Sequence, residues 1–314
     1  MIPELRAYFQ SLGADISAER SEQGLEEDLS KIIAVCETSF TAPEATETDV
    51  EGIMNGIVSM LALCSGDKNE ELVLAFCEKL SKAPTTEMGL VAMKVLWTLF
   101  QVNVFFKKRE YKYKVVLFQS FGATSILRYH VYYYLVGLAG KTGQLDTVFS
   151  DMVTTRNMFR TVDPALTTEQ LQMLYRLLHE VLLAAGRSEE AGQVMVELLG
   201  TFTMENASEA REEAQRCVVA SLADPNTFLF DHLLSLKPVK HLAGELIHDL
   251  LNIFVSEKLE VYIKFYESNK SFVDGLGLKH EDNLRKMKLL SFMQLAENRF
   301  VQTCKIRKVK ENII

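Results

Sequence analysis

The chain has 314 residues, of which 48% are hydrophobic, and it contains only 6 prolines and 16 glycines. This length suffices for one or two domains with a sizeable core, and the composition excludes a mostly disordered chain. The formal net charge of −8 argues against a protein that binds nucleic acid over its whole surface. Because the prolines mostly fall between periodic segments, we predict an all-α protein of helices joined by short turns.

The cysteines and the N-terminus bear on the cellular compartment. The five cysteines are widely spaced and form no C-x-x-C pair, so neither a zinc site nor a disulfide framework is predicted. The first ten residues lack the basic and apolar regions of a signal peptide, and no apolar run reaches the roughly 18–20 residues that span a bilayer. We expect a cytosolic protein without membrane association, with reduced and buried thiols at Cys36, Cys64, Cys77, Cys217 and Cys304.

Apolar residues recur at helical spacing through the first hundred residues, which we interpret as N-terminal helical repeats. The first segment ends at Gly13, a residue type that commonly terminates helices. An acidic, Thr-rich link at 41–50 separates the first two helices from the next pair. Helices are predicted over 1–12, 25–40, 50–64, 70–80 and 89–100.

Residues 101–124 differ from their surroundings, because aromatic, β-branched and basic residues replace the helical pattern. Their alternation is compatible with a strand, and cations interleaved with aromatics resemble a platform for single-stranded nucleic acid. A lone hairpin among helices would have no sheet to pair with, so we favour a poorly ordered insert. A weak RNA contact remains a candidate function of Lys107, Lys108, Arg109, Lys112 and Lys114.

The next helix, over 126–138, runs into a glycine-rich stretch at 137–143 that is similar to a phosphate-binding loop. A Walker A motif would need a glycine where this chain has Leu135, and it would follow a strand rather than a helix. We therefore predict that these glycines end the helix and bind no nucleotide.

The second half of the chain continues the helical pattern from residue 125 to 296. A capping box, Thr167-x-x-Gln170, opens a helix that ends at Gly186, and residues 188–199 are expected to return antiparallel to it. Further helices are predicted over 206–222 and 282–296, with a glycine-containing turn at 272–278. Apolar residues every four positions predict one long helix from Val239 to Val255. The basic segment 297–314 has little helical periodicity.

Few residues could support catalysis or metal binding. Glu245-x-x-His248 supplies half of a di-iron carboxylate motif, but the second half is missing. The chain contains neither H-E-x-x-H nor G-x-S-x-G. We predict no catalytic, cofactor-binding or metal site, and an enzyme that uses Glu245 and His248 is the less favoured alternative.

Several stretches resemble one known family closely. The resemblance is to the subunit M family of eukaryotic translation initiation factor 3, which is part of the PCI-domain proteins that also occur in the proteasome lid and the signalosome. It covers roughly 1–100 and 125–296. It is carried by VMVELLGTFT (194–203), DPNTFLFDHLLSLKPVKHLAGELIHDLLNIFVSEKL (224–259), YIKFYESNKSFVDGLGL (262–278) and KMKLLSFMQLA (286–296).

The resemblance implies a right-handed superhelix of stacked antiparallel helical hairpins, with 125–296 as the helical part of a PCI domain. In the family a winged-helix subdomain follows; here 297–314 is a basic, unrelated tail, so we expect that subdomain to be missing. The implied function is a non-catalytic cytoplasmic scaffold that binds the other subunits of the factor and, through them, messenger RNA, initiator transfer RNA and the 40S ribosomal subunit. Alternatives are a scaffold of another PCI complex and an RNA-binding helical protein. No cofactor or small-molecule substrate is implied.

Overall fold

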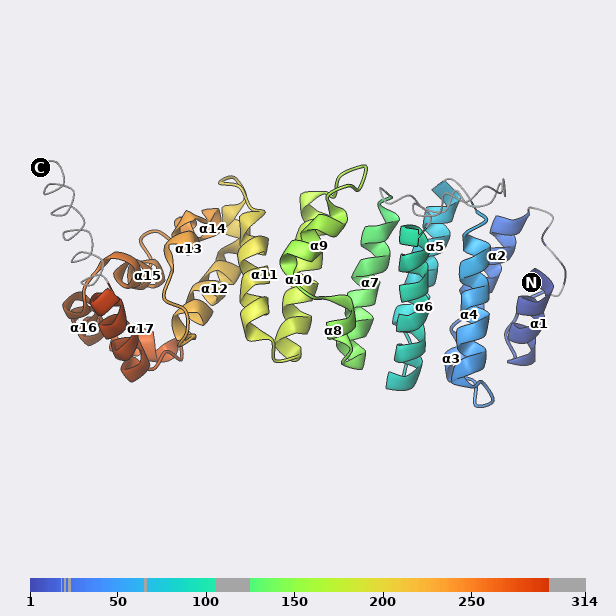
Figure 1. The fold of residues 1–314 in the computed structure, drawn as a ribbon, viewed down its shortest axis with the longest axis horizontal. Coiled ribbons are helices and arrows are strands. Elements are labelled where there is room, and N and C mark those ends of the chain that lie inside the picture. The colour runs from blue at the N-terminus through green and yellow to red at the C-terminus, as the bar shows by residue number, and fades with distance from the viewer. Residues whose placement is uncertain (18, 20, 22–23, 65–66, 106–124, 294–314) are drawn as a thin grey trace, which may run out of the picture. The chain divides into compact units, whose positions relative to one another are not determined.

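The computed structural model describes the chain except for residues 18, 20, 22–23, 65–66, 106–124 and 294–314 (Figure 1). Within the described residues the regular structure is helical and no residue lies in a β-strand, which confirms the all-α prediction. The chain divides into two compact units, Met1–Ala191 and Gly192–Ile314.

In the first unit, helices contact one another in a regular pattern. Helix α4 lies against α1, α5 and α6, whereas α5 lies against α2 and α7, and α7 also contacts α6 and α10. Neighbouring helices are visible side by side in Figure 1. The helices are α1 (Ile2–Ser11), α2 (Leu25–Val35), α3 (Thr38–Thr41), α4 (Glu47–Leu61), α5 (Asp67–Ser81), α6 (Thr86–Phe105), α7 (Leu127–Thr142), α8 (Leu145–Val148), α9 (Met152–Phe159) and α10 (Thr168–Ala184).

Side-chain caps explain where several of these helices begin. The predicted capping box is confirmed: Gln170 N–H donates to the Thr167 hydroxyl at 3.2 Å, and Thr167 N–H donates to Oε1 of Gln170 at 2.9 Å. Asp151 caps α9 in a related way, by accepting from the backbone N–H of Thr154 at 2.7 Å. Each such bond satisfies a donor that the first helical turn leaves unpaired. At the other end of α10, Gly186 has φ +74°, as predicted for a terminator.

The periodic apolar residues form the core of the first unit. The pattern over 25–40 directs Leu29, Ile32, Ile33 and Cys36 inward, and all four are buried. Burial of each aliphatic side chain among them contributes roughly 1.5–3 kcal/mol before entropy is counted. The buried residues of this core include Phe9, Leu29, Ile32, Ile33, Cys36, Met54, Ile57, Leu61, Phe76, Val95 and Leu96.

The glycines of 137–143 end the helix as predicted, but only at the last of them, so the predicted end at residue 138 is wrong. Helix α7 continues through Gly137 and Gly140 and ends only at Gly143, which has φ +70°. A Cβ on Gly140 would lie 2.6 Å from Cγ1 of Val181, so this glycine allows α7 to approach α10 closely. The helix predicted over 89–100 is also longer than expected. Helix α6 reaches Phe105 and so includes the first residues of the 101–124 segment.

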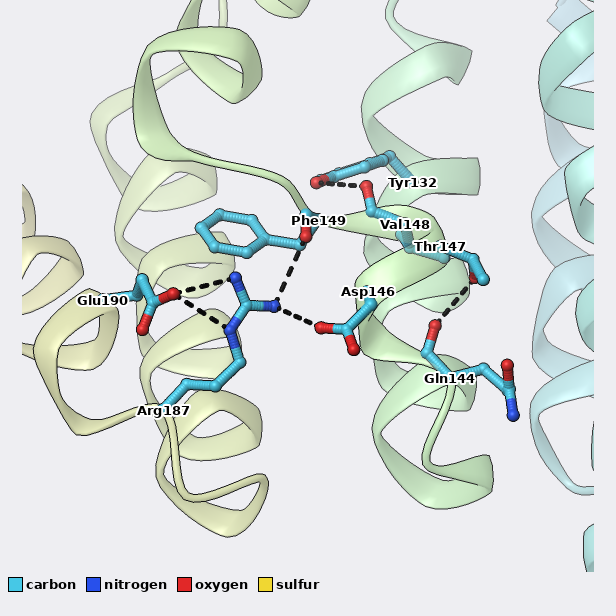
Figure 2. A network of polar contacts seen from close by, with 8 residues as sticks. All are labelled: Tyr132, Gln144, Asp146, Thr147, Val148, Phe149, Arg187 and Glu190. Atoms are coloured by element: carbon cyan, nitrogen blue, oxygen red, sulfur yellow. Dashed lines mark hydrogen bonds and ion pairs between the residues drawn. The ribbon is translucent and has the colours of Figure 1, made fainter.

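Two arginines tie loops to helices in this unit. Arg6, only 1% exposed, donates to Oδ1 of Asp28 at 2.5 Å and to the carbonyl oxygens of Ser17 and Glu19, which fastens the segment after α1 onto α2. Figure 2 shows the second arginine, Arg187.

Arg187 joins the loop that follows α8 to the start of α11 (Ser188–Gly200). Its Nη1 donates to Asp146 at 2.9 Å and to the Phe149 carbonyl at 3.5 Å, whereas Nε and Nη2 donate to Glu190 at 3.2 and 3.0 Å (Figure 2). The guanidinium also lies over the Phe149 ring, 5.4 Å from its centroid.

The second unit consists of shorter helices. Helix α12 contacts η1, α14 and α15, and α16 contacts α15 and α17. Residues 280–293 form a further helix. The other elements are η1 (Ala207–Ala210), α12 (Arg211–Ala223), α13 (Asp231–Ser235), α14 (Lys237–His241), α15 (Leu246–Ser256), α16 (Leu259–Ser268) and α17 (Lys270–Gly275).

The prediction of a single helix from Val239 to Val255 is wrong. The chain turns after α14, because Gly244 adopts φ +91°, and α15 then begins at Leu246. Leu242 and Leu250 are buried as the four-residue spacing predicts, but Leu246 is 40% exposed. A spacing of four cannot distinguish one helix from two when a glycine at the junction is free to take a left-handed conformation.

Candidate interaction surface

The two residues of the half di-iron motif, Glu245 and His248, form hydrogen bonds with other side chains. Both carboxylate oxygens of Glu245 accept from Arg211, each at 3.0 Å, and Oε2 also accepts from Gln215 at 2.8 Å. Nδ1 of His248 is 3.0 Å from Nδ2 of Asn252. In the part of the chain that the structure describes, no three histidine, cysteine, aspartate or glutamate side chains are grouped to hold a metal ion. Glu245 and His248 therefore have structural partners.

The other histidines lie on different elements, with His130 on α7. His280 stacks on Tyr266 with ring centroids 3.8 Å apart, and its Nδ1 lies 3.1 Å from the Tyr262 hydroxyl. Nδ1 of His179 is 3.0 Å from the Ala191 carbonyl. His232 and His241 are exposed on α13 and α14.

The two sequence features that resembled binding sites for phosphate or RNA have different outcomes. In the glycine-rich stretch, Lys141 donates to the Ser81 carbonyl at 3.1 Å and the Thr142 hydroxyl donates to the Leu138 carbonyl at 2.9 Å, so both belong to the end of α7. The candidate RNA contacts at 107–109, 112 and 114 lie outside the described residues.

Four of the five cysteines are buried free thiols. Burial raises the pKa of Cys36 and of Cys217 to about 12, and it also raises the pKa of Cys64 and Cys77. Because the thiolate is the reactive form, these thiols are poor nucleophiles at neutral pH.

The second unit contains a buried lysine. Lys286, on the 280–293 helix, is 5% exposed, and its Nζ donates to the carbonyl oxygens of Leu222 at 2.7 Å and of Asp224. The ammonium group also lies 5.5 Å from the centroid of the Phe230 ring. Carbonyls at a helix C-terminus have no partner within the helix, so Lys286 caps α12 and holds the last described helix against it.

A hollow of about 560 Å³ lies beside this lysine. The buried apolar side chains of Leu222 and Leu278 line this hollow. Leu289 also lines it and is 46% exposed. Phe228 lines both this hollow and a second depression. Leu229 and Met293 also line the second depression.

The apolar residues around these depressions are unusually exposed. Leu229 is 70% exposed, Phe292 is 71% exposed and Met293 is 50% exposed. Leu289, Phe292 and Met293 follow one another on the 280–293 helix at spacings that place them on one side. We call the set Leu229, Leu289, Phe292 and Met293 the apolar rim.

Sequence reasoning assigned Phe292 to the same helix as the buried Met287 and Leu290 but did not foresee its exposure. A signal was present: apolar residues at 284, 287, 289, 290, 292 and 293 occupy more of the helix circumference than one core-facing stripe requires. Such excess indicates a second apolar contact.

Comparison with known proteins shows similarity over almost the whole chain. The chain is 49% identical over 296 residues to "Eukaryotic translation initiation factor 3 subunit M" of Culex quinquefasciatus, a match that covers 94% of this chain and 71% of the mosquito protein. The chain belongs to the subunit M family of eukaryotic translation initiation factor 3. The subunit M proteins of Aedes aegypti (49% identity, 94% of this chain, 71% of the relative) and Drosophila melanogaster (48%, 95% and 71%) are similar to the same extent.

No family model matches the chain. The subunit M assignment therefore rests on whole-chain identity, and it confirms the family resemblance found in the sequence. Among the helices that the structure describes, none is both long and apolar enough to cross a membrane.

Proposed function

We propose that this chain is a non-catalytic scaffold subunit of eukaryotic translation initiation factor 3 and acts in the cytoplasm. The observation that carries the proposal is 48–49% identity to subunit M proteins over 94–95% of the chain. Identity of this extent covers core and surface residues alike, so it supports a shared role as well as a shared fold.

The helix contacts support a scaffold built from stacked hairpins. In the first unit, α1 with α2, α4 with α5, and α6 with α7 contact within pairs, and α4 links α1 to α6 as α5 links α2 to α7. Contacts of each pair with the next are typical of helical-repeat proteins, which offer extended surfaces to several partners. The proposed architecture is a right-handed superhelix of such hairpins, with residues 125–296 as the helical part of a PCI domain.

The proposed partners are the other subunits of the factor and, through the assembled complex, messenger RNA, initiator transfer RNA and the 40S ribosomal subunit. The role requires protein contacts rather than a catalytic site.

Co-purification tests this proposal. An affinity-tagged chain expressed in insect cells should retain the other initiation factor 3 subunits through size-exclusion chromatography, and a tagged subunit M relative serves as the positive control. Migration of this chain alone, while the control assembles, would show that it does not act as a subunit of the complex.

A further inference from the structure

We draw no further inference here: the strongest candidate, the apolar rim beside the hollow lined by α12 and the 280–293 helix, is an exposed apolar face next to residues that the structure does not describe, and nothing in the structure shows what covers it.

Discussion

Nζ of Lys286 donates to the carbonyl oxygen of Leu222 at 2.7 Å, so a lysine far along the chain caps the C-terminal end of α12. Lys286→Met removes the donor but keeps a long apolar stem. At neutral pH we expect the free energy of unfolding to fall by about 1–3 kcal/mol, because the α12 carbonyls lose a charged donor. Urea unfolding followed by circular dichroism measures the change. Lys288→Met, at an exposed neighbouring site, should stay within about 0.5 kcal/mol of the parent.

The same lysine predicts a pH dependence. Burial lowers the pKa of Lys286 to about 8, below the value of about 10.4 in an unfolded chain. Between these values the unfolded state binds more protons than the folded state, so the free energy of unfolding rises with pH. The stability difference between the parent and Lys286→Met should therefore grow from about pH 8 to about pH 10.4, by at most about 3 kcal/mol. A difference that is constant over this range would contradict the assignment.

Gly140 is predicted to tolerate no side chain. A Cβ there would meet Cγ1 and Cγ2 of Val181 at 2.6 and 2.8 Å, and β-branched valine has little rotamer freedom on a helix. Gly140→Ala should cost about 1–3 kcal/mol of unfolding free energy, as overpacking usually does.

Two further variants test the cause of that loss. Gly137→Ala, on the same helix with nothing within 4 Å of its added Cβ, should gain up to about 1 kcal/mol. Val181→Ala should reduce the penalty of Gly140→Ala in a double-mutant cycle. A penalty that is independent of residue 181 would show that the close approach of α7 and α10 is not its cause.

The buried pair of Arg6 and Asp28 should be far more sensitive than exposed pairs. Asp28→Asn leaves the guanidinium, 1% exposed, without its carboxylate, and should cost about 3–5 kcal/mol. Glu27→Gln removes the partner of Lys31 in an exposed pair one residue away, and should cost about 0.5 kcal/mol or less. Chemical denaturation measures both losses of unfolding free energy. Equal losses for Asp28→Asn and Glu27→Gln would refute the predicted difference between the buried and the exposed pair.

Arg187 should act through its planar, multidentate geometry rather than its charge alone. Arg187→Lys keeps the charge but cannot reach Asp146, the Phe149 carbonyl and Glu190 together, so we expect a loss of about 1–2 kcal/mol. Asp146→Asn should cost less than about 0.5 kcal/mol, because Asp146 is 90% exposed. Thermal unfolding of the two variants provides the comparison, and a larger loss for Asp146→Asn would contradict it.

Local patterns predicted the helices that carry their own start and stop signals. The capping box at Thr167 and Gln170 and the terminator Gly186 needed only neighbouring residues, so the bounds of α10 could be read in advance. The predicted helix bounds failed around Gly140 and Gly244. They depend on which side chain packs against the glycine or on the backbone conformation that the glycine adopts. Sequence spacing contains neither piece of information.

The sequence by itself determined the helical class, the buried apolar stripes and, through its resemblance to relatives, the family, because these depend on residue order and local periodicity. Only the tertiary structure decided that Gly140 is a contact point, that Lys286 caps a helix some sixty residues earlier, and that Leu289 and Phe292 are exposed. Each of these properties arises from groups that are distant in sequence and adjacent in space. Their positions are fixed by the packing of whole helices, which periodicity along one helix does not specify.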